Sequence, residues 1–401
     1  MDMAKPKIRF KGYVEDWEQR KLGEVATFIN GRAYSQDELL SSGKYKVLRV
    51  GNFYTNDSWY YSDMELDDKY YAVDGDLLYT WSATFGPHLW RGDKVIYHYH
   101  IWKVELSEAL EKRFAVQLLE QDKQAILSDK NGSTMVHITK KGMEEKEVIL
   151  PTNVNEQRKI GNHLDALDHL ITLHQRKCEE VKTLKKFMLQ KMFPQNGMKV
   201  PEIRFNGFTD DWEQRKLGEL SSSFEYGLNA AAKSYDGKNK YIRITDIDDE
   251  TRTFLDSDLT SPDCDLALSE NYLLQDGDIV FARTGASVGK TFIYKASDGV
   301  VYYAGFLIRA RLKENVSPQF VFYNTLTKKY EKFIRITSQR SGQPGVNAQE
   351  YATFELFLPK YEEQCEIGKF FCNLDHLITL HQRKCDELQK IKKFMLQNMF
   401  I

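Results

Sequence analysis

The feature that most limits how this chain can fold is that its sequence is written twice. A short segment, Ile8–Glu24, returns 195 residues later as Ile203–Glu219, with the eight residues WEQRKLGE unchanged. A long segment, Glu156–Phe193, returns 207 residues later as Glu363–Phe400, with twelve consecutive residues unchanged. Repeats of this kind predict one structural unit that is used more than once. We therefore expect two copies of one architecture.

The stretches between the repeats barely match each other. The first variable block runs from about residue 25 to 155, and the second from 220 to 362. A recent duplication without functional divergence explains the near-identical frames, but it explains the different blocks poorly. We predict two different binding domains, residues 1–154 and 197–361. Each is followed by a long helix, residues 155–196 and 362–401.

Each long repeat predicts an extended α-helix. Its apolar residues recur at alternating steps of four and three, the heptad pattern of a coiled coil. Neither repeat contains an internal proline, and Pro194 follows the first one directly. Because each helix follows a separate globular block, the simplest arrangement is an antiparallel coiled coil. The predicted seam positions are Ile160, Leu164, Leu167, Ile171 and His174, and in the second copy Ile367, Phe371, Leu374, Ile378 and His381.

Two positions on each predicted seam have side chains that bind metals in other proteins. His174 and Cys178 are four residues apart and face the same way on a helix, as do His381 and Cys385. A metal site is one interpretation. The other is that these residues fix the register of the helices, as single polar residues do in coiled coils. We favour the second interpretation and predict no metal site.

The composition excludes several classes of protein. With 42% hydrophobic and 13% aromatic residues, the 401-residue chain is not disordered, and its length suggests two or three domains. No apolar run is long enough for a transmembrane helix, and the start lacks the apolar region of a signal peptide. We therefore expect a cytoplasmic protein without membrane contact. The five cysteines include no CxxC pair, which favours free thiols.

The two variable blocks share an order of elements in spite of their low identity. In each block a strand with an embedded arginine, Arg49 or Arg243, precedes an Asp-Gly-Asp turn, a second strand and a loop of small polar residues. A β-rich stretch, an amphipathic helix, another small-residue loop and a closing strand follow. This mixture predicts α/β domains.

The net charge of −2 is not typical of a nucleic-acid-binding protein, but basic residues are concentrated locally. Residues 328–340 contain five positive groups and one negative group, and they lead directly into a polar loop at 340–349. In the first block, lysines flank the loop at 131–139. Lysine and arginine neutralise phosphates, whereas arginine and short polar side chains read base edges. The pattern favours a reader of duplex DNA.

The sequence contains no pattern that predicts catalysis. Gly285–Thr291 (GASVGKT) resembles a phosphate-binding P-loop, but three residues rather than four separate its first glycine from the Gly-Lys pair. The sequence has no NPPF or DPPY tetrapeptide, no glycine-rich AdoMet loop and no HExxH motif. We predict a non-catalytic protein that holds no cofactor of its own.

The complete layout resembles the specificity (S) subunits of type I restriction–modification systems. The resemblance rests on WEQRKLGE at Trp17–Glu24 and Trp212–Glu219, on the LP…EQ…I junctions before the long repeats, and on the shared ending KKFMLQxMF. It extends over essentially all 401 residues. It implies two target-recognition domains, each binding one half of a bipartite, asymmetric site in double-stranded DNA.

The resemblance also implies partners. The two helices would set the spacer between the half-sites and dock two methyltransferase (M) subunits, for which we predict the seam positions named above. The M subunits would bring AdoMet, and restriction (R) subunits would bring ATP and Mg²⁺. A rigid helical ruler agrees with this role because one face of DNA recurs about every 10 base pairs.

The expected DNA contacts lie in the polar loops. In the second block, RTGASVGKT and SGQPGVN resemble segments of the family, whereas the first block departs from it with WSATFG and NGSTMVHI. For the second half-site we predict contacts from Arg283, Thr284, Ser287, Lys290, Arg335, Arg340, Gln343 and Asn347. For the first we predict contacts from Thr80, Trp81, Ser82, Lys130, Ser133, Thr134 and His137.

Two other functions stay open on the sequence. One is a protein–protein scaffold in which two binding modules on a coiled coil contact no DNA. The other is a nucleotide-dependent enzyme. Salt-dependent DNA binding separates the first from a DNA reader, and nucleotide binding by the chain alone would support the second.

Overall fold

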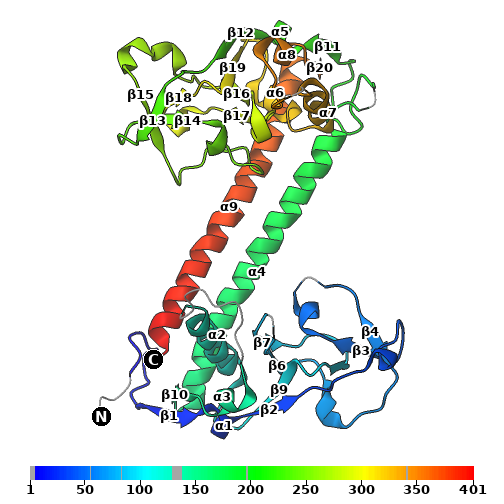
Figure 1. Ribbon diagram of the computed structural model, residues 1–401, viewed down its shortest axis with the longest axis vertical. Coiled ribbons are helices and arrows are strands. Elements are labelled where there is room, and N and C mark those ends of the chain that lie inside the picture. Colours follow the sequence, from blue (N-terminus) through cyan, green and yellow to red (C-terminus); the bar gives the residue numbers. More distant parts are fainter. Residues whose placement is uncertain (1–4, 55, 83, 129–137, 196, 340–341) are drawn as a thin grey trace. The chain divides into compact units, whose positions relative to one another are not determined.

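The structure, a computed structural model, describes residues 5–54, 56–82, 84–128, 138–195, 197–339 and 342–401. The chain divides into two compact units, whose elements are labelled in Figure 1. Unit 1 contains Met1–His174 and Arg383–Ile401, and unit 2 contains Gln175–Gln382. Each unit thus combines one variable block with the first half of the helix that follows it and the second half of the other long helix.

Unit 1 is a mixed α/β fold. In its described part, two four-stranded sheets have the orders β2-β9-β6-β7 and β4-β3-β8-β5, and β1 pairs with β10. The strands are β1 (Trp17–Lys21), β2 (Ala26–Asn30), β3 (Tyr45–Leu48), β4 (Tyr60–Ser62), β5 (Tyr71–Ala72), β6 (Leu77–Thr80), β7 (Gly86–Leu89), β8 (Val95–Tyr97), β9 (Ile101–Leu106) and β10 (Glu147–Pro151). The α-helices are α1 (Leu22–Val25), α2 (Lys112–Ser128), α3 (Lys140–Glu144), the first part of α4 (Val154–Lys191) and the last part of α9 (Tyr361–Met399).

Unit 2 has a closely related set of elements. Its four-stranded sheet has the order β12-β19-β16-β17, and the described residues also form the pairs β11-β20, β13-β15 and β14-β18. The strands are β11 (Glu213–Lys216), β12 (Ser221–Tyr226), β13 (Ala231–Ser234), β14 (Asn239–Ile242), β15 (Thr260–Asp263), β16 (Ile279–Ala282), β17 (Thr291–Ile293), β18 (Val300–Tyr303), β19 (Leu307–Leu312) and β20 (Glu355–Leu358). The α-helices are the second part of α4, α5 (Leu217–Leu220), α6 (Pro318–Asn324), α7 (Lys328–Thr337), α8 (Ala348–Ala352) and the first part of α9.

The variable blocks share the order of their main sheet and one parallel strand pair. The sheet β2-β9-β6-β7 corresponds to β12-β19-β16-β17, and the parallel pair β3-β8 corresponds to β14-β18. In unit 1, β6 and β9 lie between a lobe with β3 and β4 and a lobe with α2 and α3 (Figure 1). Every residue of β6 and β16 is buried, because other elements pack on both faces of these strands. Their sequences are therefore continuous runs of buried residues and do not alternate between apolar and polar side chains. The prediction of mixed α/β domains is confirmed.

The repeated WEQRKLGE segment closes each block. Its first residues form β1 or β11, which pair antiparallel with β10 or β20 at the end of the block. The register is the same in both units: Glu18 lies opposite Leu150, and Glu213 opposite Leu358. The tryptophan of the segment is buried in each core. Identical frames therefore tie the two ends of each block together in the same way.

A buried ion pair joins each short repeat to a long one. The Arg9 guanidinium contacts both carboxylate oxygens of Glu156, at 2.6 and 2.8 Å. At the equivalent place Arg204 contacts both oxygens of Glu363, at 2.6 and 2.7 Å. Both glutamate side chains are 1% exposed. Bidentate geometry is the arrangement in which an arginine best satisfies a carboxylate that has left water.

The glutamine that follows this glutamate holds the block against its helix. The side-chain amide of Gln157 donates to the carbonyls of Pro151 and Ala109, and its oxygen accepts the N–H of Glu111. Gln364 repeats the arrangement in unit 2, where it donates to Pro359 and accepts from Ser317. These contacts explain why the Glu-Gln pair belongs to the constant frame.

The predicted seam residues are buried between the helix segments of each unit. Their exposed fractions are 1, 0, 8 and 9% for Ile160, Leu164, Leu167 and Ile171, and 1, 0, 6 and 7% for Ile367, Phe371, Leu374 and Ile378. In unit 2, Cys178 Sγ lies 3.9 Å from the carbonyl oxygen of Ile378. Just beyond the end of α4, Phe193 stacks on Phe371, at 5.8 Å between ring centroids. Residue numbers rise along α4 while they fall along α9, so the two segments are antiparallel.

Two lysines on the seam form the same ion pair in each unit. Lys185 Nζ lies 2.6 Å from Asp375 Oδ1 in unit 2, and Lys392 Nζ lies 2.6 Å from Asp168 Oδ1 in unit 1. The lysine side chains are 13 and 16% exposed. Their methylene groups therefore fill the seam while the ammonium groups reach its edge. This pairing explains how the heptad pattern tolerates lysine at these positions.

Several sequence predictions concern groups outside the site. The five cysteines are free thiols, as predicted, and Cys178 and Cys385 are buried. His174 and His381 are half-buried. Within the described ranges, no cluster of three or more His, Cys, Asp or Glu residues is placed to hold a metal ion. The helices that the structure describes include none that is both long and apolar enough to span a membrane.

Candidate nucleic-acid interface

The candidate interface lies where two buried strands end in polar loops. Directly after β6 and β16 come Trp81 and Arg283. Trp81 donates its backbone N–H to the carbonyl of His100 (3.2 Å), and Arg283 donates to that of Phe306 (3.0 Å). The two residues therefore occupy equivalent places. This region, the loop edge, comprises residues 81–82 and 98–100 in unit 1 and residues 283–290, 304–306 and 342–347 in unit 2.

A glycine in each unit lets the main chain pass close behind the loop edge. A Cβ atom on Gly31 would lie 2.4 Å from the carbonyl oxygen of His98. On Gly227 it would lie 2.1 Å from that of Ala304. Both separations are far below van der Waals contact, so these positions require glycine. The position of each loop edge depends on this close approach.

In unit 2, two loops that are about sixty residues apart in sequence form one surface. Val346 donates its N–H to the carbonyl of Arg283 (2.9 Å), and Gly285 donates to that of Pro344 (3.0 Å). The two polar loops predicted to contact DNA are therefore adjacent. Main-chain hydrogen bonds fix their relative position.

Three other predicted contacts lie on this surface. Thr284 forms an isolated antiparallel bridge with Gly345. Gln343 is exposed, and its Nε2 would lie 3.1 Å from a Cβ atom on Gly285. Ser287 ends a short 3₁₀ turn, Gly285–Ser287, and its carbonyl accepts the N–H of Lys290. Thr284 therefore follows Arg283 directly on this surface, and Gln343 lies against Gly285.

Arg283 has an ordered but uncompensated charge. Its guanidinium carbon lies 5.0 Å above the ring of Tyr226. Tyr226 is 45% exposed, and its hydroxyl accepts the N–H of Ala348 (3.3 Å). Among the described residues no carboxylate lies within ion-pair distance of Arg283. A cation–π contact orients a guanidinium without neutralising it, so the charge of Arg283 remains for a ligand.

Lys290 uses its charge inside unit 2. Its Nζ lies 2.7 Å from Asp249 Oδ1 and donates to the carbonyl of Ile247 (3.2 Å), and the side chain is 12% exposed. The ammonium group of Lys290 faces another loop, so the DNA contact predicted from Lys290 stays a prediction without support from this geometry. The same geometry argues against a P-loop at Gly285–Thr291, in which the lysine must face the phosphates.

Asn347 also has a local structural role. Its side-chain oxygen accepts the N–H of Glu350 (2.9 Å), and the Glu350 carboxylate accepts the N–H of Asn347 (2.8 Å). This reciprocal pair is a capping box at the start of α8. Asn347 is exposed, so the prediction that it contacts DNA stays a prediction.

Arg335 lines a cleft of about 1050 Å³ within unit 2. The cleft lies between the second part of α4, helix α7 and the loop edge. Its charged lining residues are Lys182, Lys185, Lys186, Arg252, Lys290, Arg335, Glu179, Asp249, Glu250, Glu331 and Asp375. The two signs are nearly balanced, so the cleft as a whole is not a simple phosphate groove. Arg335 itself is exposed.

The basic segment at 328–340 is less uniform than its sequence indicates. Lys329 turns inward, where its Nζ lies 4.6 Å from the ring centroid of Phe357. Burial lowers the pKa of Lys329. Lys328, Lys332 and Arg335 are exposed on the same helix. The helical period divides these residues between the two faces, which a count along the sequence does not distinguish.

In unit 1 the predicted residues Thr80, Trp81 and Ser82 have different surroundings. Thr80 is fully buried, and its hydroxyl lies 3.3 Å from both the Gly86 carbonyl oxygen and His88 Nε2. Thr80 is not accessible to a ligand, so this prediction is wrong: Thr80 is the last residue of the strand and faces the core. Trp81 and Ser82 are half-buried at the loop edge.

Trp81 belongs to an aromatic cluster. Its ring stacks on Trp102 at 5.8 Å between centroids, and its Nε1 donates to the carbonyl of Tyr99 (2.9 Å). The His100 ring lies 5.1 Å away in an edge-on arrangement. Tyr99 is 39% exposed. The loop edge of unit 1 is therefore mainly aromatic where that of unit 2 has Arg283.

The histidines near this cluster are uncharged at neutral pH. Burial, with contributions from His100 and Arg49, lowers the pKa of His98 to about 4. Burial also lowers the pKa of His88 to about 4, with a contribution from Lys123, and lowers that of His100. At neutral pH these rings offer hydrogen bonds and stacking, but no positive charge.

Five predicted contacts, Lys130, Ser133, Thr134, His137 and Arg340, lie outside the residues that the structure describes. Residues that the sequence prediction missed include Tyr226, Tyr99 and Phe306, which is 59% exposed. The signal for them was weak: Tyr99 and Phe306 follow the β-rich stretches that end in β8 and β18. Tyr99 and Phe306 are placed at the loop edge by their carbonyls, which accept hydrogen bonds from Trp81 and Arg283.

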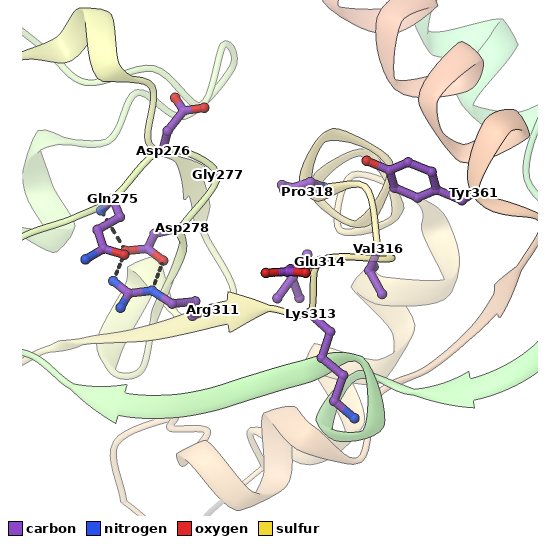
Figure 2. A pocket seen from close by; sticks show the side chains of 11 residues that line it. Gln275, Asp276, Gly277, Asp278, Arg311, Lys313, Glu314, Val316, Pro318 and Tyr361 are labelled. Carbon is purple, nitrogen blue, oxygen red and sulfur yellow. Dashed lines mark hydrogen bonds and ion pairs between the residues drawn. The ribbon is translucent and has the colours of Figure 1, made fainter.

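A smaller pocket of about 190 Å³ lies elsewhere in unit 2, between the Asp276–Asp278 turn and the starts of α6 and α9 (Figure 2). Asp278 and Arg311 point toward each other and form a bidentate ion pair, at 2.9 and 2.8 Å (Figure 2). Pockets for small ligands are usually about 300 Å³ or larger. The pocket is small and its central charges are paired, so it does not resemble a cofactor site.

The eight apolar helix residues predicted to dock partners are buried in the seam, so they hold the helices together and are not accessible to another subunit, whereas His174 and His381 are half-buried. A second apolar stripe is exposed instead, with exposed fractions of 40–53%. In unit 1 it consists of Leu170, Leu173, Ile391 and Phe394, and in unit 2 of Leu184, Phe187, Leu377 and Leu380. These residues share the heptad spacing of the seam but lie on a different face.

Comparison with known proteins identifies the family. The profile of the family described as "Type I restriction modification DNA specificity domain" matches residues 14–183 and residues 209–390. The chain belongs to this family. It therefore has two target-recognition domains of a type I restriction–modification specificity subunit, a family whose role is DNA recognition. The resemblance noted from the sequence is confirmed.

Individual relatives agree with this assignment. The chain is similar to the type I restriction enzyme MjaVIII specificity subunit of Methanocaldococcus jannaschii, at 24% identity over 94% of this chain and 91% of the relative. A solved type I restriction–modification S subunit from M. genitalium has the same fold, with a TM-score of 0.69 and 15% identity over 99% of each chain. A chain from a solved type I restriction–modification assembly has a TM-score of 0.50 and 15% identity, over 96% of this chain and 97% of that one.

Proposed function

We propose that each unit of this specificity subunit reads one half of a bipartite, asymmetric DNA site, and that the long helices set the spacer between the halves. One observation supports this most directly: the loop edges occupy equivalent places but have different side chains. Unit 1 presents Trp81 and His100, and unit 2 presents Arg283 and Phe306. One scaffold with two different sets of readers fits two different half-sites.

Binding of the assembled complex to DNA at several salt concentrations tests this proposal. The chain with its M subunit should bind a duplex that contains both half-sites, and log K should fall linearly with log salt. With six or more phosphate contacts, affinity should fall about a thousandfold between about 50 and 200 mM salt. Changing either half-site should weaken binding. Binding of protein partners without salt-dependent DNA binding would favour the scaffold alternative.

We further propose that catalysis belongs to the partners. M subunits would bring AdoMet and methylate DNA, and R subunits would bring ATP and Mg²⁺, while this chain holds no cofactor. The paired charges of the small pocket and the inward-facing Lys290 support this division. The chain would then contribute recognition and spacing alone.

We propose that the exposed stripe docks two M subunits, one on each unit. Each unit presents four large apolar side chains from α4 and α9, and the two sets are related by the internal repeat. Exposed apolar residues grouped in this way mark protein–protein contacts. The ion pairs Lys177–Glu180 and Lys384–Glu387 occupy the intervening positions of the stripe in the two helices. A repeated surface fits two copies of one partner.

A change confined to one stripe should remove one partner. The double variant Leu173→Glu/Phe394→Glu places charges in the unit 1 stripe, so the complex should contain one M subunit per chain instead of two. Burying an apolar side chain of this size contributes about 1.5–3 kcal/mol, so two losses should weaken docking more than a hundredfold. Native mass spectrometry of the complex measures how many M subunits each chain binds. Thr172→Glu/Thr379→Glu, on another exposed face, is the control; two bound M subunits in both variants would refute the assignment.

A further inference from the structure

Each unit has an arginine at the same place, next to the loop that forms its loop edge. Arg49 follows β3 and Arg243 follows β14, the strands that pair in parallel with β8 and β18. The preceding residue of each, Leu48 or Ile242, accepts the N–H of His98 or Ala304. The two arginines are therefore structurally equivalent, and each lies beside the chain that leads into the loop edge.

The charge of Arg243 is neutralised inside unit 2. Its guanidinium contacts both carboxylate oxygens of Asp246, at 2.8 and 2.9 Å, and Asp246 also accepts the backbone N–H of Arg243 (2.9 Å). The Asp246 side chain is 11% exposed. A bidentate pair of this kind leaves the arginine little capacity to bind an outside anion.

The charge of Arg49 has no such partner. The residue equivalent to Asp246 is Asn52, whose side-chain oxygen accepts the backbone N–H of Arg49 (3.0 Å) but brings no negative charge. Among the described residues, no carboxylate lies within ion-pair distance of Arg49. The amide of Asn52 instead donates to the carbonyls of Asn56 and Ser58. The two units thus differ at one position: Asp246 neutralises Arg243 in unit 2, whereas Asn52 leaves the charge of Arg49 uncompensated in unit 1.

The surroundings of Arg49 hold its guanidinium in place. The guanidinium carbon lies 4.2 Å from the centroid of the Tyr60 ring, and Nη2 donates to the Ser58 carbonyl (3.2 Å). Its Nε atom is buried without a hydrogen-bond partner. A guanidinium held by a main-chain carbonyl and an aromatic ring cannot extend far from the protein surface. Such a group is better placed to contact a phosphate than a base deep in a groove.

We propose that Arg49 is a phosphate contact of the first half-site, and that the residue at position 52 or 246 decides whether the arginine of each unit can bind DNA. Unit 1 lacks an arginine at the position of Arg283, because Trp81 stands there. Unit 1 therefore supplies its positive charge from Arg49, whereas unit 2 supplies it from Arg283. This inference rests on the proposed function, because it assumes that unit 1 binds DNA.

The test measures DNA affinity of the chain–M complex against salt for two variants. Arg49→Gln removes the charge directly, and Asn52→Asp introduces the counter-ion that unit 2 has. Each should lower the slope of log K against log salt by about 0.9, the value for one phosphate, and weaken binding to all sequences equally. In the control, Arg243→Gln/Asp246→Asn, a neutral pair is replaced by neutral residues, so the slope should not change.

The outcomes separate this inference from the proposed function. If Arg49→Gln binds with unchanged affinity and slope, Arg49 is not a contact and the inference fails. If the loss is confined to one base pair, Arg49 reads a base and the phosphate assignment fails. If the unmodified complex shows no salt-dependent binding, the proposed function itself fails. Circular dichroism of each variant confirms that the change acts on the folded protein.

Discussion

Replacement of Arg283 by alanine is expected to lower methylation of DNA by the assembled complex about ten- to a hundredfold, through the half-site that unit 2 reads. The Arg283 guanidinium is oriented by Tyr226 and has no carboxylate partner among the described residues. Arginine most often reads guanine through two hydrogen bonds, worth about 1–3 kcal/mol of discrimination. Initial rates of methyl transfer to duplexes with one altered base pair each would measure the effect.

The distinguishing feature of this prediction is that the loss is specific to sequence. Arg283→Ala should lose discrimination at one base pair of the second half-site and keep it everywhere else. Arg335→Gln removes the same charge from an exposed arginine of the same unit and should lower all rates together. Relative rates over the duplex series that match those of the unmodified complex would show that Arg283 reads no base.

Replacement of Arg204 by alanine is expected to lower the free energy of unfolding of unit 2 by about 3–5 kcal/mol. Arg204 forms both hydrogen bonds to the carboxylate of Glu363, whose side chain is 1% exposed. Removing one partner of a buried ion pair leaves a charge without compensation, and this costs about 3–5 kcal/mol. Urea denaturation, with hydrogen exchange of β11 and β20 to resolve unit 2, would measure the change.

A matched pair of controls isolates the buried charge as the cause. Arg215→Ala breaks the ion pair with Glu213, whose side chains are 49 and 69% exposed, and should cost at most about 1 kcal/mol. The double variant Arg204→Met/Glu363→Met removes both charges and should recover most of the stability. If the two variants Arg204→Ala and Arg215→Ala lower the free energy of unfolding equally, the ion pair between the short and long repeats is not a major source of stability.

The sequence predicted the architecture well where the pattern is local and periodic. Heptad spacing identified the seam, because residues three and four apart share one face of a helix. Exact repetition of WEQRKLGE predicted a repeated frame, and β1 and β11 have the same register in both units. The ion pairs of Lys185 and Lys392 were not predicted. Each lysine pairs with an aspartate on the other helix, and the heptad pattern of one helix does not show which residue lies opposite.

The site was predicted less completely. Loop composition located Arg283, Thr284 and Gln343, which the fold brings together at the loop edge. It did not distinguish the buried Thr80 from the half-buried Trp81 that follows it directly. Nor did it show that Lys290 is neutralised by Asp249. Burial and pairing depend on residues distant in sequence, so a loop pattern alone does not decide them.

By itself, the sequence determined that this chain has two copies of one frame, two different blocks and two long amphipathic helices, because each of these is a pattern of spacing or identity. The tertiary structure decided which polar groups remain for a partner. Arg49 and Arg243 occupy equivalent places after a strand, yet among the described residues only Arg243 has a carboxylate within ion-pair distance. The physical reason is that a carboxylate neutralises an arginine only at short distance, and packing decides which side chains lie that close.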